Sequence, residues 1–160
     1  MIARHRRLGA LTVGLLVASG CGDGDDGADR LPAVTLPALA DGGSSLELAE
    51  LDGPAVVNLW ATWCEPCRRE LPDFQAASND HPGVRFVGVD IGEESARAQA
   101  FLDELGVTFE QYADVDGELA DRLGVASLPV TVVIDDDRHI ATRHLGPMSR
   151  DQLDEALAEL

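Results

Sequence analysis

The chain is 160 residues long, 45% of them hydrophobic, and 29 acidic residues against 12 basic ones give it a formal net charge of -17. This length supplies one well-buried core and excludes two ordinary domains in addition to a leader, so we predict a single domain that acts as a monomer. The acidic balance disfavours nucleic-acid binding, which needs positive charge against the phosphates.

The N-terminus has the pattern of a secretory signal peptide. An arginine-rich start, residues 4–7, precedes an apolar run over residues 8–18, and small residues follow before Cys21. The run is shorter than the roughly 20 residues that a transmembrane helix needs. We therefore expect residues 1–20 to be a leader that is cleaved.

The segment Ala18-Ser19-Gly20-Cys21 resembles the bacterial lipobox, in which the cysteine is acylated and becomes the new N-terminus. Leu usually stands where this chain has Ala18, so ordinary cleavage that leaves a free Cys21 is the alternative. Gly and Asp dominate residues 21–30, which we expect to form a flexible acidic linker. The folded domain then spans residues 31–160, held by the lipid on Cys21 at the extracytoplasmic face of a bacterial cell membrane.

The first part of the domain has the pattern of a strand, a helix and a second strand. The apolar run over residues 55–60 follows Gly53-Pro54 and predicts a buried central strand. Helix formers fill residues 65–77, and residues 84–89 form a second buried run. A helix that connects two buried strands predicts a parallel pair.

The later elements continue this alternation. We expect helices over 95–105 and 117–123, strands over 130–134 and 140–145, and a last helix that begins at Ser149. The turn-forming residues 135–138 make the final strand antiparallel to its predecessor, so the sheet is mixed. Together the elements predict an α/β domain in which helices cover both faces of a mixed central β-sheet.

The sequence Trp63-Cys64-Glu65-Pro66-Cys67 lies where the first strand passes into the first helix. A helix N-terminus presents unpaired N–H groups, and such sites lower a cysteine pKa from about 8.5 to between roughly 3.5 and 7.5. We predict that Cys64 is the nucleophile and that Cys67, three residues further on, resolves the mixed disulfide that Cys64 forms with a partner.

A pair of cysteines at this spacing can also be half of a zinc site. A structural zinc normally needs a second pair of ligands, and the only other cysteine is Cys21. His81, His139 and His144 show no ligand spacing with the pair. We therefore expect a site that works without a metal or another cofactor.

Residues 57–72, from Val57 to Pro72, resemble the signature of the TlpA/ResA-like thioredoxins, which are membrane-anchored bacterial thiol-disulfide oxidoreductases. The resemblance extends over roughly residues 34–160. It implies a thioredoxin fold, client proteins whose disulfides or thiols are exchanged, and a membrane thiol reductant that recycles the cysteines. The commonest use of this family is the maturation of apocytochrome c.

The resemblance also implies residues that support the cysteine pair. Pro129 matches a proline with a cis peptide bond that packs against the disulfide, although an ordinary trans proline at the start of a strand is the alternative. From their positions beside and between the cysteines, Trp63 is expected to shield the site, and Glu65 to tune its potential through its negative charge, with a merely solvated Glu65 as the alternative. Pro66 completes the motif.

Glu70 follows Cys67 by three residues and so shares a helix face with it, where its carboxylate could exchange a proton with the thiol. ResA-like members carry a functional glutamate at this spacing, whereas the alternative is an exposed glutamate on the helix surface. Cytoplasmic thioredoxins use a buried aspartate on the preceding strand, and Asn58 stands there in this chain. Because Asn58 cannot ionise, proton handling falls to Glu70, Glu65 or water.

Two other functions occur on related folds. A thiol peroxidase generally has its reactive cysteine in a Thr-x-x-Cys context, and Thr62 stands one residue too close to Cys64. A copper chaperone of the SCO type uses Cys-x-x-x-Cys and a distant histidine, whereas this pair has two intervening residues. Both alternatives are disfavoured, and the direction of electron flow stays open.

Overall fold

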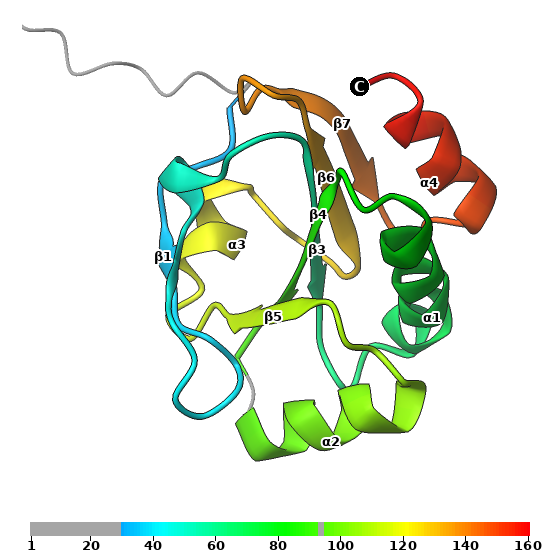
Figure 1. The fold of residues 1–160 in the computed structure, drawn as a ribbon. Coiled ribbons are helices and arrows are strands. Elements are labelled where there is room, and N and C mark those ends of the chain that lie inside the picture. Colours follow the sequence, from blue (N-terminus) through cyan, green and yellow to red (C-terminus); the bar gives the residue numbers. More distant parts are fainter. Residues whose placement is uncertain (1–29, 93–94) are drawn as a thin grey trace, which may run out of the picture.

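The computed structural model describes residues 30–92 and 95–160, which form a five-stranded mixed sheet with helices on both faces (Figure 1). The strands lie in the order β5-β4-β3-β6-β7. Their bounds are β3 Ala55–Trp60, β4 Arg85–Asp90, β5 Glu110–Ala113, β6 Val130–Ile134 and β7 Ile140–Leu145. The helices are α1 Glu65–Asp80, α2 Ser95–Leu105, α3 Glu118–Arg122 and α4 Arg150–Leu157.

The central strand is β3, which pairs parallel with β4 and antiparallel with β6. The predicted strands and helices are confirmed, and so is the antiparallel return of β7. The capping box at the start of α4 is present: Ser149 accepts from the N–H of Gln152, whose side chain accepts from the N–H of Ser149.

Three strands were not predicted. The hairpin strands β1 (Thr35–Leu36) and β2 (Leu46–Glu47) have two residues each, followed by a short 3-10 helix, η1 (Leu48–Glu50). The edge strand β5 begins with polar, partly exposed residues, so it lacks the apolar run of a buried strand. Arg30, assigned to the linker, already forms a bridge with His139.

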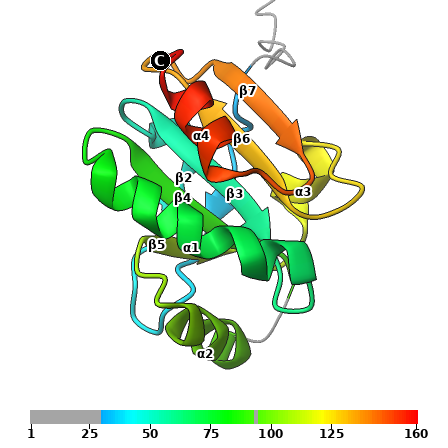
Figure 2. The ribbon, with the colours of Figure 1, turned by 90° about the vertical axis from the view of Figure 1, so that its right-hand side faces the viewer.

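Alternating residues of β3 supply two different cores. Ala55, Val57 and Leu59 pack with residues of β1, β2 and α3 on one face of the sheet. Val56 points to the opposite face and packs with residues of α1 and α4. Figure 2 shows α1 and α4 lying across this second face. Every residue of β3 is buried, which explains why the strand reads as one apolar run.

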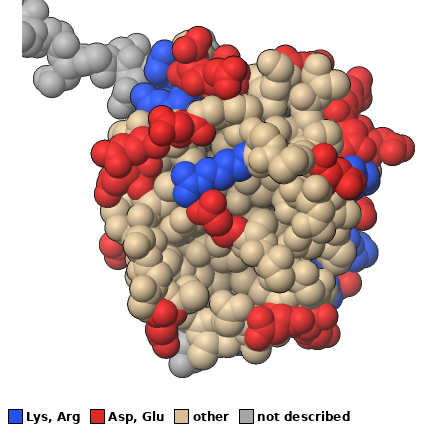
Figure 3. All heavy atoms as spheres, viewed as in Figure 1, with Lys and Arg blue, Asp and Glu red and all other residues tan. Residues whose placement is uncertain are grey.

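The surface is acidic, as the net charge requires. On the face shown in Figure 3, acidic side chains outnumber basic ones and lie mainly around the rim. Within residues 30–92 and 95–160, none of the helices has the length and apolar character needed to cross a bilayer.

Candidate functional site

The cysteine pair lies in the loop that joins β3 to α1. Cys64 is the N-cap residue of α1, and it forms a disulfide with Cys67 in the first turn. The two Cα atoms are 5.3 Å apart. Cys64 Sγ also accepts a hydrogen bond from the backbone N–H of Cys67 at 3.2 Å. The helix begins here because Pro66 occupies its first turn, where a residue without an N–H removes no helical hydrogen bond.

The two sulfur-bearing residues differ in their surroundings. Cys64 retains 4% of its surface exposed, whereas Cys67 retains none. Both belong to a core cluster with Leu71 and Phe101. Trp63 precedes Cys64 in the chain and is 64% exposed, so its side chain lies at the surface next to the disulfide and is not part of a hydrophobic core. A protein partner can therefore approach the pair only from the side of Cys64.

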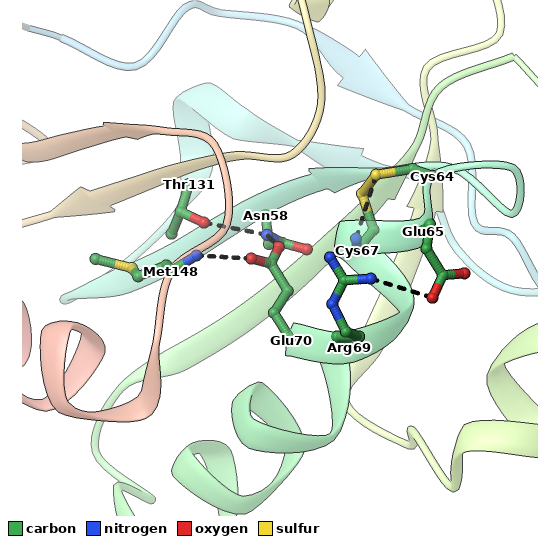
Figure 4. Close-up of a disulfide and its surroundings, with 8 residues drawn as sticks. All are labelled: Asn58, Cys64, Glu65, Cys67, Arg69, Glu70, Thr131 and Met148. Atoms are coloured by element: carbon green, nitrogen blue, oxygen red, sulfur yellow. Dashed lines mark hydrogen bonds and ion pairs between the residues drawn. A yellow bond between two sulfur atoms is a disulfide. The ribbon is translucent and has the colours of Figure 1, made fainter.

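Glu65, between the two cysteines, points into solvent. Its carboxylate pairs with Arg69 one turn later at 3.1 Å, and both side chains are mostly exposed (Figure 4). An exposed pair of this kind is screened by water and holds little free energy. The negative charge of Glu65 is therefore paired with the positive charge of Arg69.

Glu70 is buried, and the alternative prediction that it is an exposed surface residue is wrong. Only 3% of its surface is accessible, because its helix face packs against β3. Its Oε1 accepts from the Asn58 side-chain amide and its Oε2 from the backbone N–H of Met148, both at 2.9 Å. Burial raises the pKa of Glu70 to about 7, and the two hydrogen bonds limit that rise.

Asn58, on β3, connects Glu70 to the neighbouring strand β6. Its Nδ2 donates both to Glu70 and, at 3.1 Å, to the hydroxyl of Thr131 on β6 (Figure 4). The expected buried amide is thus only half satisfied, because Asn58 Oδ1 has no hydrogen-bond partner among the described residues. Sequence reasoning missed Thr131, although the β3–β6 register pairs it with Asn58. It also missed Met148, which contributes only a backbone group that no side-chain pattern reveals.

Pro129 has the predicted cis peptide bond, which joins it to Leu128. The residue after it, Val130, pairs with Leu59 near the C-terminal end of β3. Pro129 therefore lies at the end of the sheet from which the chain continues to the cysteines. Leu128 packs against the cluster that contains Cys64 and Cys67. The strand register thus brings Pro129 and the disulfide to one end of the sheet.

The surroundings of the disulfide are otherwise aromatic and apolar. Trp60 stacks on Phe101 of α2 with ring centroids 5.4 Å apart, and the guanidinium of Arg68 lies 4.7 Å from the same phenyl ring. Arg68 also pairs with Glu104 at 2.9 Å. In the described part of the chain, no three His, Cys, Asp or Glu side chains are grouped as metal ligands.

Comparison with known proteins identifies the family. The family model described as Redoxin matches residues 27–160. The chain is a member of the Redoxin family. This redoxin is similar to the thiol-disulfide oxidoreductase ResA of Halalkalibacterium halodurans, with 33% identity over 71% of this chain and 66% of the relative. It is 35% identical to the thiol:disulfide interchange protein HelX of Rhodobacter capsulatus, over 75% of this chain and 68% of that protein.

Solved structures confirm the thioredoxin fold. A secreted Mycobacterium tuberculosis disulfide oxidoreductase, described as homologous to Escherichia coli DsbE, has a TM-score of 0.72 and 28% identity, covering 80% of this redoxin and 96% of that chain. DsbF of the same organism has a TM-score of 0.73 and 30% identity over the same shares. The resemblance to ResA-like proteins is confirmed, and the match spans just under two thirds of the Halalkalibacterium protein.

Proposed function

We propose that this redoxin is a thiol-disulfide oxidoreductase that acts outside the cytoplasm and reduces disulfides in client proteins. The observation that carries the proposal is the Cys64–Cys67 disulfide at the N-terminus of α1, where Cys64 keeps 4% of its surface accessible and Cys67 keeps none. The activities named for the ResA and HelX relatives and for the secreted Mycobacterium tuberculosis oxidoreductase support the same reaction.

The reaction begins with the reduced pair. The N-cap position favours the thiolate of Cys64, because the free N–H groups of the first helical turn carry partial positive charge. This thiolate attacks one sulfur of a client disulfide, forms a mixed disulfide and releases the other client sulfur as a thiolate. Cys67, after losing its proton, attacks the Cys64 sulfur, which closes the Cys64–Cys67 disulfide and releases the second client thiolate. The client gains two electrons and the pair loses them.

Glu70 is the proposed proton acceptor for Cys67. It lies three residues further along the buried face of α1, and a carboxyl group with a pKa of about 7 exchanges protons readily near neutral pH. Glu65 is less suited, since its carboxylate is exposed and engaged with Arg69. We assign the proton-handling role to Glu70 for this reason.

Exposed apolar side chains provide the proposed client surface. Trp63, Val115 and Leu145 are each about two thirds exposed. They follow or end the strands β3, β5 and β7, which run in the same direction, so all three lie towards the end of the sheet that carries the disulfide. An apolar surface suits the unfolded clients whose disulfides are accessible, and apocytochrome c is the client class that we propose.

The predicted leader and lipid site lie outside the described residues, and we keep them as part of the proposal. Residues 1–20 would be removed, Cys21 acylated, and residues 21–30 would separate the domain from the membrane. A membrane thiol reductant on the same side would then recycle the disulfide. Labelling cells with a fatty-acid analogue tests this: the wild-type protein should be labelled, whereas a Cys21→Ser protein that still carries label would contradict the assignment.

The experiment that tests the reaction compares cysteine variants in the reduction of insulin by dithiol-recycled protein. Cys64→Ser should abolish activity, and Cys67→Ser should accumulate mixed disulfides through Cys64 that mass spectrometry identifies. Cys21→Ser is the matched control, since it removes a cysteine outside the pair and should keep the wild-type rate in solution. A Cys64→Ser protein that reduces insulin at the wild-type rate would overturn the proposal.

A further inference from the structure

Asn58 faces the side of α1 that carries the two groups that exchange a proton in the proposed reaction. Cys67 and Glu70 are on the same buried face of α1, and Asn58 faces that helix from β3. Its Nδ2 serves Glu70, while its buried Oδ1 has no partner among the described residues. In Figure 4 this oxygen points away from Glu70 and towards the first turn of α1, where Cys67 lies. A buried acceptor left unpaired is unfavourable, so its direction towards a redox-active cysteine is informative.

The backbone N–H of Met148 determines where Glu70 can hold a proton. This N–H can only donate, so Oε2 of Glu70 must remain an acceptor. A proton on Glu70 therefore occupies Oε1, which faces the Asn58 amide at 2.9 Å. The amide must then turn so that Oδ1 accepts from Glu70, and Nδ2 moves to the side of Cys67. The hydroxyl of Thr131 can donate or accept, so it remains bonded to either end of the amide.

We propose that the Asn58 amide is a positioning group that couples the protonation of Glu70 to that of Cys67 in the reduced protein. This inference rests on the proposed function and deepens it. With Glu70 ionised, Oδ1 accepts from the Cys67 thiol; with Glu70 protonated, Nδ2 donates to the Cys67 thiolate. Either orientation satisfies a pair that holds one proton. If the pair holds two protons, one of the two donors faces Nδ2, which cannot accept. If the pair holds none, one of the two acceptors faces Oδ1, which cannot donate.

The coupling has a defined place in the reaction. In the resolving step the mixed disulfide, the Cys67 thiol and the Glu70 carboxylate become the Cys64–Cys67 disulfide, a client thiolate and the Glu70 carboxylic acid. The sulfur–sulfur bond to the client breaks, the client sulfur leaves with the electron pair, and the proton of Cys67 ends on Glu70. Turning the amide stabilises the Cys67 thiolate while that proton is on Glu70.

The parent and its variants share the other titratable and charged groups on the surrounding elements. Besides Glu70, these groups are Glu65, Arg68, Arg69, Asp73 and Asp80 on α1, Arg85 and Asp90 on β4, Arg143 and His144 on β7, and Arg150, Asp151, Asp154 and Glu155 on α4. The arginines of α1 and α4 are paired with carboxylates. Asp90 is buried opposite Trp60, and His144, beside Thr131, contacts the carbonyl oxygen of Pro147.

The test is the titration of Cys67 in the full chain carrying Cys21→Ser and Cys64→Ser, followed by the Cβ chemical shift of Cys67 in carbon NMR. A coupled pair titrates in two macroscopic steps. Losing a hydrogen bond to a charged group should shift these pKa values by about one pH unit, so Asn58→Ala should bring the two steps closer by about that amount. Glu70→Gln should leave a single step.

Thr131→Val is the matched control. It removes a neighbouring hydrogen bond from the same amide but leaves the amide between Glu70 and Cys67, so the two steps should remain as far apart as in the parent. Asn58→Leu, which keeps the volume, replaces Asn58→Ala if that variant does not fold. Equal separation in the parent and the Asn58 variant, or an equal loss in Thr131→Val, would overturn the coupling. Insulin reduction by the protein with both active-site cysteines tests the proposed function separately.

Discussion

Replacing Glu70 with glutamine should change how the stability of the oxidised protein depends on pH. The pKa of Glu70 is about 7 in the folded protein and 4.5 in its ordinary range, so the folded state binds this proton more tightly than the unfolded state. Stability from this group is complete below pH 4.5 and is lost as the pH rises through 7. The difference between the two pKa values corresponds to about 3 kcal/mol.

Glutamine isolates this contribution because it fits the same hydrogen bonds without ionising. Its oxygen can accept from the N–H of Met148, and its amide can donate to Asn58 once the latter turns its unpaired oxygen. Urea unfolding of the oxidised protein at a series of pH values should show that the wild type loses about 3 kcal/mol relative to Glu70→Gln between pH 4.5 and 8.

Glu65→Gln is the control for this measurement. It neutralises an exposed glutamate on the same helix, so its stability relative to the wild type should vary little over the same range. The reasoning is refuted if the difference in unfolding free energy between Glu70→Gln and the wild type does not change with pH, or if the wild type gains stability as the pH rises. Either result would show that the carboxyl group is not held in a desolvated site.

Two further predictions concern the client surface and the aromatic core behind the disulfide. Trp63→Ala should raise the KM for insulin several-fold while leaving the rate with a small aromatic disulfide nearly unchanged, because the exposed indole borders the pair; equal effects on both substrates would refute a docking role. Gly88→Ala should destabilise the protein by about 1–3 kcal/mol in urea unfolding, because the new Cβ would lie 2.0 Å from the Gln111 Oε1 atom that accepts from the buried Trp60 indole. Its effect should largely vanish in a Gln111→Ala background, and a full additional loss there would show that backbone strain is responsible.

The strands and the cysteine site could be predicted because their signals are local. β3 is buried on both faces and therefore reads as a continuous apolar run, and the cysteines follow it directly. By contrast, the edge strand β5 begins with Glu110 and Gln111, whose polar side chains conceal it. The clue to β5 lies in the neighbouring strand β4. Gly88 has no side chain there, and this leaves space for the Gln111 side chain to reach the indole of Trp60.

The environment of Glu70 could not be predicted because it is assembled from distant parts of the chain. Spacing alone places Glu70 on the same helix face as Cys67, but that face could equally have been solvated. Its burial depends on β3, on Thr131 from β6 and on the segment that begins at Met148. A backbone N–H has no residue preference, so the Met148 contact leaves no mark in the sequence.

The two cysteines differ in their surroundings, and this difference supports the order that we propose for them in the reaction. Cys64 is the N-cap of α1, where the partial positive charge of the first turn favours a thiolate in the reduced protein, and it is the cysteine of the pair that keeps some accessible surface for a client. Cys67 is fully buried on the helix face that carries Glu70, and in the proposed reaction it must lose its proton away from solvent. Cys67 therefore becomes nucleophilic only when its proton has somewhere to go, after Cys64 has already reacted. In the proposed reaction, the carboxyl group of Glu70, with a pKa of about 7, is that acceptor near neutral pH, so removing it should slow the resolving step rather than the first attack.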